Sequence, residues 1–150
     1  MIKQTGFLAS LLAVGLGLAA PAVLADDPIK DIIDHEVPAL KDGTRIAVPD
    51  VERAILDACA RRRFTASVVS PGEITARWEN RGHWFDVAIT YTDATYSIRY
   101  KDSQRMDYNA AKRRIDDAYH EYVDGLMEHI EADFERALKR LKQSQKLARK

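Results

Sequence analysis

The chain has 150 residues, with 23 basic and 23 acidic side chains, and this balance argues against a dedicated nucleic-acid-binding protein. It contains one cysteine, Cys59, which excludes an intramolecular disulfide. The length suits one domain with a single core and is too short for two.

The first 25 residues have the pattern of an export signal. Lys3 supplies a positive start, and residues 7–20 form an apolar run that is short for a bilayer span. Small residues at Val23 and Ala25 then precede Asp26, as a signal peptidase requires. We therefore expect cleavage after Ala25, release into the periplasm, and no transmembrane segment in the mature chain.

Residues 26–43 mix acidic side chains with prolines and a glycine, which is typical of a linker. Ile29, Ile32 and Ile33 allow one short amphipathic turn of helix within it. The sequence then predicts a short strand at Arg45–Val48.

A helix is predicted next, over about Val51–Arg62, because apolar residues recur there at helical spacing. Asp50 suits its N-cap. Cys59 falls on the same apolar stripe, and we interpret it as a buried residue rather than a nucleophile. Arg61, Arg62 and Arg63 follow where the helix dipole favours positive charge, and we interpret them as a solvated helix end in preference to a binding patch.

Four alternating patterns predict strands with one apolar face each. These apolar residues are Phe64, Ala66 and Val68; Ile74, Ala76 and Trp78; Phe85, Val87, Ile89 and Tyr91; and Tyr96, Ile98 and Tyr100. Gly72 suits a left-handed turn between the first two strands. Counting outward from the turns sets Trp78 against Phe85, Ile74 against Ile89, and Ile89 against Ile98.

The opposite face of this predicted sheet is polar. The same register sets Arg77 and Lys101 against Asp86 from its two sides. We interpret these three residues as cross-strand ion pairs on a solvated face.

A long amphipathic helix is predicted from about Asp107 to Gln143, because apolar residues recur at spacings of three or four. It would cover one face of the sheet and extend past it, since four strands are narrower than the helix is long. Residues 142–150 form a basic tail. Such a run suits an anionic surface, or it is a solvated helix end.

Tyrosines gather between the third strand and the middle of the long helix: Tyr91, Tyr96, Tyr100, Tyr108, Tyr119 and Tyr122. If the helix packs on the sheet, several phenol groups meet there and need hydrogen-bond partners. We interpret the cluster first as a structural seam. Tyr100, Tyr119 and His120 are its candidate binding residues.

His83, Asp102 and Ser103 have the residue types of a hydrolase triad, but no Gly-x-Ser-x-Gly elbow accompanies them. His120 has acidic neighbours at helical metal-ligand spacing without a His-Glu-x-x-His signature. We therefore assign no catalytic residue, metal or cofactor, and keep His83, Asp102 and Ser103 as candidate binding residues.

Four motifs occupy the strand region: Pro71-Gly72-x-Ile74-x-Ala76, Arg81-x-His83, Val87-x-Ile89-x-Tyr91 and Tyr96-Ser97-Ile98-x-Tyr100-x-Asp102-Ser103. Together they resemble a family of small exported bacterial proteins, often lipoproteins, whose function is uncharacterised. The likeness extends along the long helix to Ile130. The chain departs from the family pattern at Arg62-Arg63-Phe64 and at Asp116, His120 and Tyr122. The resemblance implies an α+β envelope domain and no known activity.

We therefore expect one α+β domain over residues 44–141, with a helix, a four-stranded antiparallel meander and a long carboxyl-terminal helix on one sheet face. The expected function is a non-enzymatic binding or scaffolding module of the cell envelope. Its expected partner is an unknown envelope protein or an anionic surface. The alternative is a small hydrolase or metal-dependent enzyme that uses His83, Asp102 and Ser103.

Overall fold

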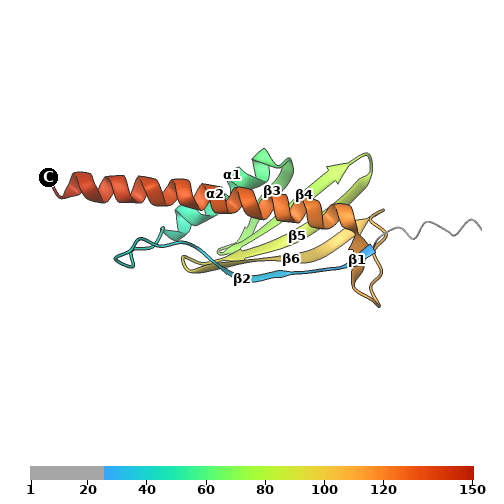
Figure 1. The fold of residues 1–150 in the computed structure, drawn as a ribbon. Coiled ribbons are helices and arrows are strands. Elements are labelled where there is room, and N and C mark those ends of the chain that lie inside the picture. Colours follow the sequence, from blue (N-terminus) through green and yellow to red (C-terminus); the bar gives the residue numbers. More distant parts are fainter. Residues whose placement is uncertain (1–25) are drawn as a thin grey trace, which may run out of the picture.

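The computed structural model describes residues 26–150 and has an α+β fold of two layers. One layer is a five-stranded antiparallel sheet with the order β2-β6-β5-β4-β3, and both helices cover the same face of it (Figure 1). A separate ribbon joins β1 to β7. The elements are β1 Asp26–Pro28, β2 Ile32–Glu36, α1 Val48–Arg61, β3 Phe64–Ser70, β4 Glu73–Asn80, β5 His83–Tyr91, β6 Thr95–Gln104, β7 Arg114–Asp116 and α2 Asp117–Ala148. The predicted signal lies outside the described residues.

The meander β3 to β6 has the predicted register, apart from the part of β6 that follows Tyr100. Trp78 faces Phe85, and Ile89 lies between Ile74 on β4 and Ile98 on β6. Gly72 takes the predicted left-handed conformation, with φ at +81°. Alternation with a period of two and short turns were sufficient to set this pairing.

The amino-terminal segment was predicted as a linker with a turn of helix, and this prediction is wrong. β2 pairs with β6 as a fifth strand, and a bulge between Ile32 and His35 places Asp34 at a positive φ. Val37 is fully buried, and His35 Nε2 lies 2.7 Å from Glu131 Oε1 on α2. An edge strand with a bulge loses its alternation, so the sequence pattern alone does not reveal it.

Helix α1 begins at Val48, three residues before the predicted start, and its N-cap is Ala47 rather than Asp50. Pro49 is compatible with the first turn because the missing N–H has no helical partner there. The predicted strand at Arg45–Val48 is reduced to a single bridge between Ala39 and Arg45.

Helix α2 begins at Asp117, well after the predicted start. Asp116 caps it, with Oδ1 accepting a hydrogen bond of 2.8 Å from the Ala118 N–H. Positive φ angles at Asp107 and Arg113 break the helical path before it, and Ile115 pairs with Asp27 in the β1–β7 ribbon. The apolar residues that predicted one long helix therefore belong to two elements: Ile115 lies in β7, and the residues from Tyr119 onward lie in α2.

The core lies between the helices and the inner face of the sheet. Phe85 is fully buried, and its ring lies 4.9 Å from that of Tyr119 on α2 and 5.8 Å from that of Phe64 on β3. Ala137 is the last buried residue of α2, and the remaining turns extend past the sheet as predicted (Figure 1). Neither described helix is both long and apolar enough to cross a membrane.

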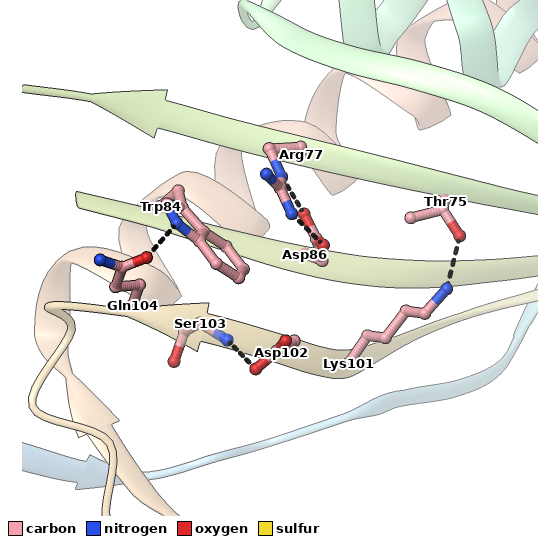
Figure 2. A network of polar contacts seen from close by, with 8 residues as sticks. All are labelled: Thr75, Arg77, Trp84, Asp86, Lys101, Asp102, Ser103 and Gln104. Atoms are coloured by element: carbon pink, nitrogen blue, oxygen red, sulfur yellow. Dashed lines mark hydrogen bonds and ion pairs between the residues drawn. The ribbon is translucent and has the colours of Figure 1, made fainter. Parts of the chain in front are cut away.

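The outer face of the sheet carries a polar network (Figure 2). Arg77 donates two hydrogen bonds to Asp86, at 2.7 and 2.8 Å, and its guanidinium lies 4.0 Å from the ring centre of Trp84. Asp86 was predicted to lie on a solvated face, but it is buried, with a relative exposure of 9%. The paired arginine covers its carboxylate.

The predicted pair between Lys101 and Asp86 does not form. A bulge makes Lys101 an extra residue on β6, so Asp86 faces Asp102 while Val87 faces Tyr100. Lys101 instead donates to Thr75 Oγ1 on β4, at 3.0 Å (Figure 2).

Replacing Ile89 with alanine is expected to lower the free energy of unfolding by about 2–5 kcal/mol, because Ile89 is fully buried in the inner face. Asp86→Ala is expected to lower the free energy of unfolding by less. The Arg77 side chain is 42% exposed, so water can solvate its guanidinium when the carboxylate is removed. Urea unfolding of both variants measures the two losses. A larger loss for Asp86→Ala would contradict the dominance of the inner face.

Cys59 is fully buried, and burial raises the pKa of its thiol to about 12. In mildly alkaline buffer the folded protein is therefore expected to react with a thiol reagent at least about a hundredfold more slowly than the denatured protein. Stopped-flow labelling with and without denaturant measures the ratio. Equal rates would place Cys59 at the surface.

Candidate functional site

The three residues of the hydrolase alternative do not form a triad. The bulge at Lys101 puts Asp102 on the outer face opposite Asp86, and Ser103 on the inner side opposite Phe85. Asp102 Oδ1 accepts from the Ser103 N–H, at 2.8 Å, while Ser103 Oγ lies 2.9 Å from the hydroxyl of Tyr100. His83 is exposed, and within residues 26–150 it has no hydrogen bond to Asp102 or Ser103.

Tyr100, Tyr119 and His120 do come together, where the amino-terminal segment meets α2. The rings of Tyr100 and Tyr119 are 5.9 Å apart, and His120 Nε2 lies 3.1 Å from the carbonyl oxygen of Pro28. Burial is the main cause that raises the pKa of Tyr119. Asp31 accepts from the Tyr100 N–H at 3.1 Å and from Arg113 at 3.0 Å. These contacts make the cluster a structural seam, as predicted.

Two other tyrosines of the cluster differ in their hydrogen bonding from what the sequence predicted. Tyr91 donates a short hydrogen bond to Glu52 on α1. The hydroxyl of Tyr96 is buried and has no hydrogen-bond partner among the described residues. Within the same part of the chain, no group of three His, Cys, Asp or Glu side chains is arranged to hold a metal ion.

A different site lies at the end of α1, in a pocket of about 350 Å³. Its walls come from the turn after α1, the end of β4 and the first half of α2. The lining residues are Arg61, Arg62, Arg63, Trp78, Glu79, Asn80 and Tyr122. Three consecutive arginines thus line one hollow: Arg61 and Arg63 are exposed, as the interpretation of a solvated helix end expects, and Arg62 is half-buried.

The local backbone explains how consecutive arginines converge. The helix ends at Arg61, Arg62 is its C-cap, and Arg63 takes a left-handed φ of +63° that turns the chain into β3. Glycine is the usual residue at such a position, and an L side chain there costs about 1–2 kcal/mol. An arginine therefore stands at a position whose backbone conformation favours glycine.

Arg61 differs from its neighbours because its charge is compensated. It forms an ion pair with Asp133 on α2, and Arg136 pairs with the same carboxylate. Asp133 is buried, with a relative exposure of 6%. These pairs attach the end of α1 to α2 and fix one wall of the pocket.

Arg62 lies across α2 at Gly125. A Cβ atom added to Gly125 would come within 2.7 Å of Arg62 Cζ, so a larger residue there would displace the guanidinium from this position. Arg62 Nε is buried and has no hydrogen-bond partner in the described chain. A buried donor without a partner costs about 1–3 kcal/mol, more for a charged group. Within residues 26–150, neither Arg62 nor Arg63 forms an ion pair.

The remaining wall is aromatic. The ring centres of Trp78 and Tyr122 are 4.1 Å apart, and Trp78 also stacks on Phe85 at 5.5 Å. This wall is rigid because it continues into the core. Aromatic faces beside guanidinium groups bind planar or apolar parts of a ligand while the arginines bind its charge.

The lining of the pocket has groups that can bind an anion. Guanidinium groups match carboxylate and phosphate oxygens in planar pairs, and Asn80 adds an amide. Glu79 is the single carboxylate in the lining. The sequence contained two signals for this site: the run of three arginines and a glycine inside a long helix. Neither signal revealed that the two lie together.

Comparisons with protein-family models, with curated proteins and with solved structures find no match for this chain. The resemblance to exported envelope proteins therefore stays a prediction.

Proposed function

We propose that this protein is a non-enzymatic binding module whose ligand carries a carboxylate or phosphate group, held in the arginine pocket. The observation that carries the proposal is Arg62, whose Nε is buried without a partner while its guanidinium lies against Gly125. An oxyanion in the pocket would supply the missing acceptor. It would also balance the charge of Arg62 and Arg63.

The predicted export signal sets the compartment of this proposal. If residues 1–25 direct export, the ligand is an anionic component of the periplasm or cell envelope. This agrees with the resemblance to exported envelope proteins. A scaffolding role would follow if the anionic group belongs to another protein.

Titration with inorganic phosphate and with acetate, followed by the backbone amide NMR signals, tests the proposal. We expect saturable shifts at Arg62, Arg63 and Asn80 with at least one of the two anions. Arg62→Gln is expected to weaken binding about tenfold, or about 1.4 kcal/mol, because it removes the charge and the fork of donors. Arg53→Gln is the matched control, since Arg53 is exposed on α1 outside the pocket.

Gly125→Ala gives an independent variant that keeps every charge. The added methyl group displaces the Arg62 guanidinium, so anion binding is expected to fall as in Arg62→Gln. The helix itself should not weaken, because alanine is favoured over glycine in a helix by about 1 kcal/mol. Unsaturable shifts in the wild type, or unchanged affinity in both variants, would contradict the proposal.

The basic end of α2 supports a second partner, an anionic membrane surface. The helix continues to Ala148, and Leu147 is 72% exposed among basic side chains. These basic residues are Lys139, Arg140, Lys142, Lys146, Arg149 and Lys150. Each can contribute about 1 kcal/mol near anionic lipid, and salt screens the attraction.

Deletion of residues 142–150 tests this second partner. Folding is expected to survive, because the buried residues of α2 end at Ala137. Binding of the residue 26–150 chain to vesicles of anionic lipid is expected at low salt, and it should fall on truncation and on addition of salt. Sedimentation with vesicles measures both effects. No binding at low salt would show that the tail is only soluble helix.

A further inference from the structure

The arginine pocket holds more positive charge than the surrounding protein balances. Among the described residues, Arg62 and Arg63 form no ion pair. Arg61 shares the single carboxylate of Asp133 with Arg136, so its own charge is balanced only in part. The carboxyl end of α1 adds only about half of a negative charge. The pocket therefore keeps a positive surplus that a bound ligand would balance.

Glu79, the single carboxylate in the lining, reduces this surplus only in part. Alternation along β4 places it on the outer face of the sheet together with Arg77. The hydrogen bonds to Asp86 are the main cause that raises the pKa of Arg77, and the charge of Glu79 adds to this effect. Glu79 thus acts on the outer face as well as on the pocket. The remaining surplus is above about one elementary charge, so a dianion balances it better than a monoanion.

The donors of the pocket suit a group with three terminal oxygens. Arg62 and Arg63 each carry a planar fork of N–H groups, and Asn80 supplies an amide. A carboxylate has two oxygens and one charge. A phosphate monoester has three terminal oxygens and about 1.5–2 negative charges at neutral pH. It therefore combines the required charge and the required acceptors in one group.

The aromatic wall indicates that this phosphate is attached to a ring. The pocket volume of about 350 Å³ is within the range of sites for small organic molecules, about 300–1,000 Å³. A free phosphate would leave the side next to Trp78 and Tyr122 to water. Tyr122 is only half-buried, so part of its side chain is open to a ligand in the pocket. A planar ring placed there would cover this surface.

We infer that the pocket binds a phosphate monoester that carries a ring. The dianionic phosphate lies against Arg62, Arg63 and Asn80. The ring lies against Tyr122 in the aromatic wall. This inference rests on the proposed anion-binding function and names the chemical class of the ligand.

Isothermal titration calorimetry on residues 26–150 tests the inference with four probes: phenyl phosphate, phenyl sulfate, phthalate and inorganic phosphate. Phenyl sulfate has the shape of phenyl phosphate but a single negative charge, so we expect it to bind about tenfold more weakly at about pH 8. Phthalate carries two charges on separate carboxylates, and inorganic phosphate has the charge without the ring. Both are expected to bind more weakly than phenyl phosphate.

Acidification separates the charge of the ligand from its shape. Between about pH 8 and pH 5 phenyl phosphate loses one negative charge, so its advantage over phenyl sulfate should shrink to about twofold or less. Two histidines adjoin the pocket: His83 pairs with Asn80 across the turn, and His129 Nδ1 lies 2.9 Å from the Gly125 carbonyl oxygen. Histidine is the side chain that usually titrates in this range. Phenyl sulfate does not titrate there, so its own affinity reports the effect of these histidines.

Arg63→Gln removes one guanidinium and keeps an L side chain at the same left-handed backbone position. We expect this variant to lose most of the preference for phenyl phosphate over phenyl sulfate while both probes still bind. Arg105→Gln is the matched control, because Arg105 is also exposed and has a left-handed φ of +57° but lies outside the pocket lining. Its preference should equal that of the wild type. Circular dichroism checks the folding of both variants.

The comparison of probes on the wild type needs no substitution, so it decides the matter even if a variant does not fold. Equal affinity for phenyl phosphate and phenyl sulfate at about pH 8 would overturn the inference and leave the proposed anion-binding function intact. The same holds if phthalate or inorganic phosphate binds as tightly as phenyl phosphate, or if Arg63→Gln keeps the full preference. Failure of all four probes to bind would contradict both the inference and the proposed function.

Discussion

Both helices lie on one side of the sheet because that side is apolar along every central strand. Phe85, at its centre, contacts rings from β3, β4 and α2, so it fixes where the long helix crosses the sheet. Burial of such surface stabilises a fold by about 25 cal/mol per Å², whereas the polar contacts of the outer face contribute much less. The positions of α1 and of the chain turn that follows it depend on this packing.

The β-bulge at Lys101 has consequences on both faces. It lets Tyr100 and Ser103 share the inner side and moves Lys101 and Asp102 to the outer side. This places a lysine near β4 and leaves Asp86 to Arg77 alone. The same shift decides which face each of the next two residues takes, Asp102 the outer face and Ser103 the inner side. One extra residue in a strand therefore sets which polar side chains lie on each face of the sheet.

The arginine pocket arises where three packing requirements meet. Asp133 holds Arg61 against α2, Gly125 leaves room for Arg62, and the left-handed residue Arg63 directs the chain into β3. Trp78 closes the pocket because its ring continues the aromatic core. The fold thus positions positive charge beside a rigid wall, which is the basis of the proposed binding function.

The sequence by itself determined the meander, its register except beyond the bulge on β6, and the apolar stripe of α2, because alternation and helical spacing are local properties. It also identified Cys59 as buried and the tyrosines as a seam. Only the tertiary structure decided that residues 32–36 are a fifth strand, since their partners on β6 lie about sixty residues away. It likewise joined Arg62, the C-cap of α1, to Gly125 on α2, a contact that no spacing along the chain can predict.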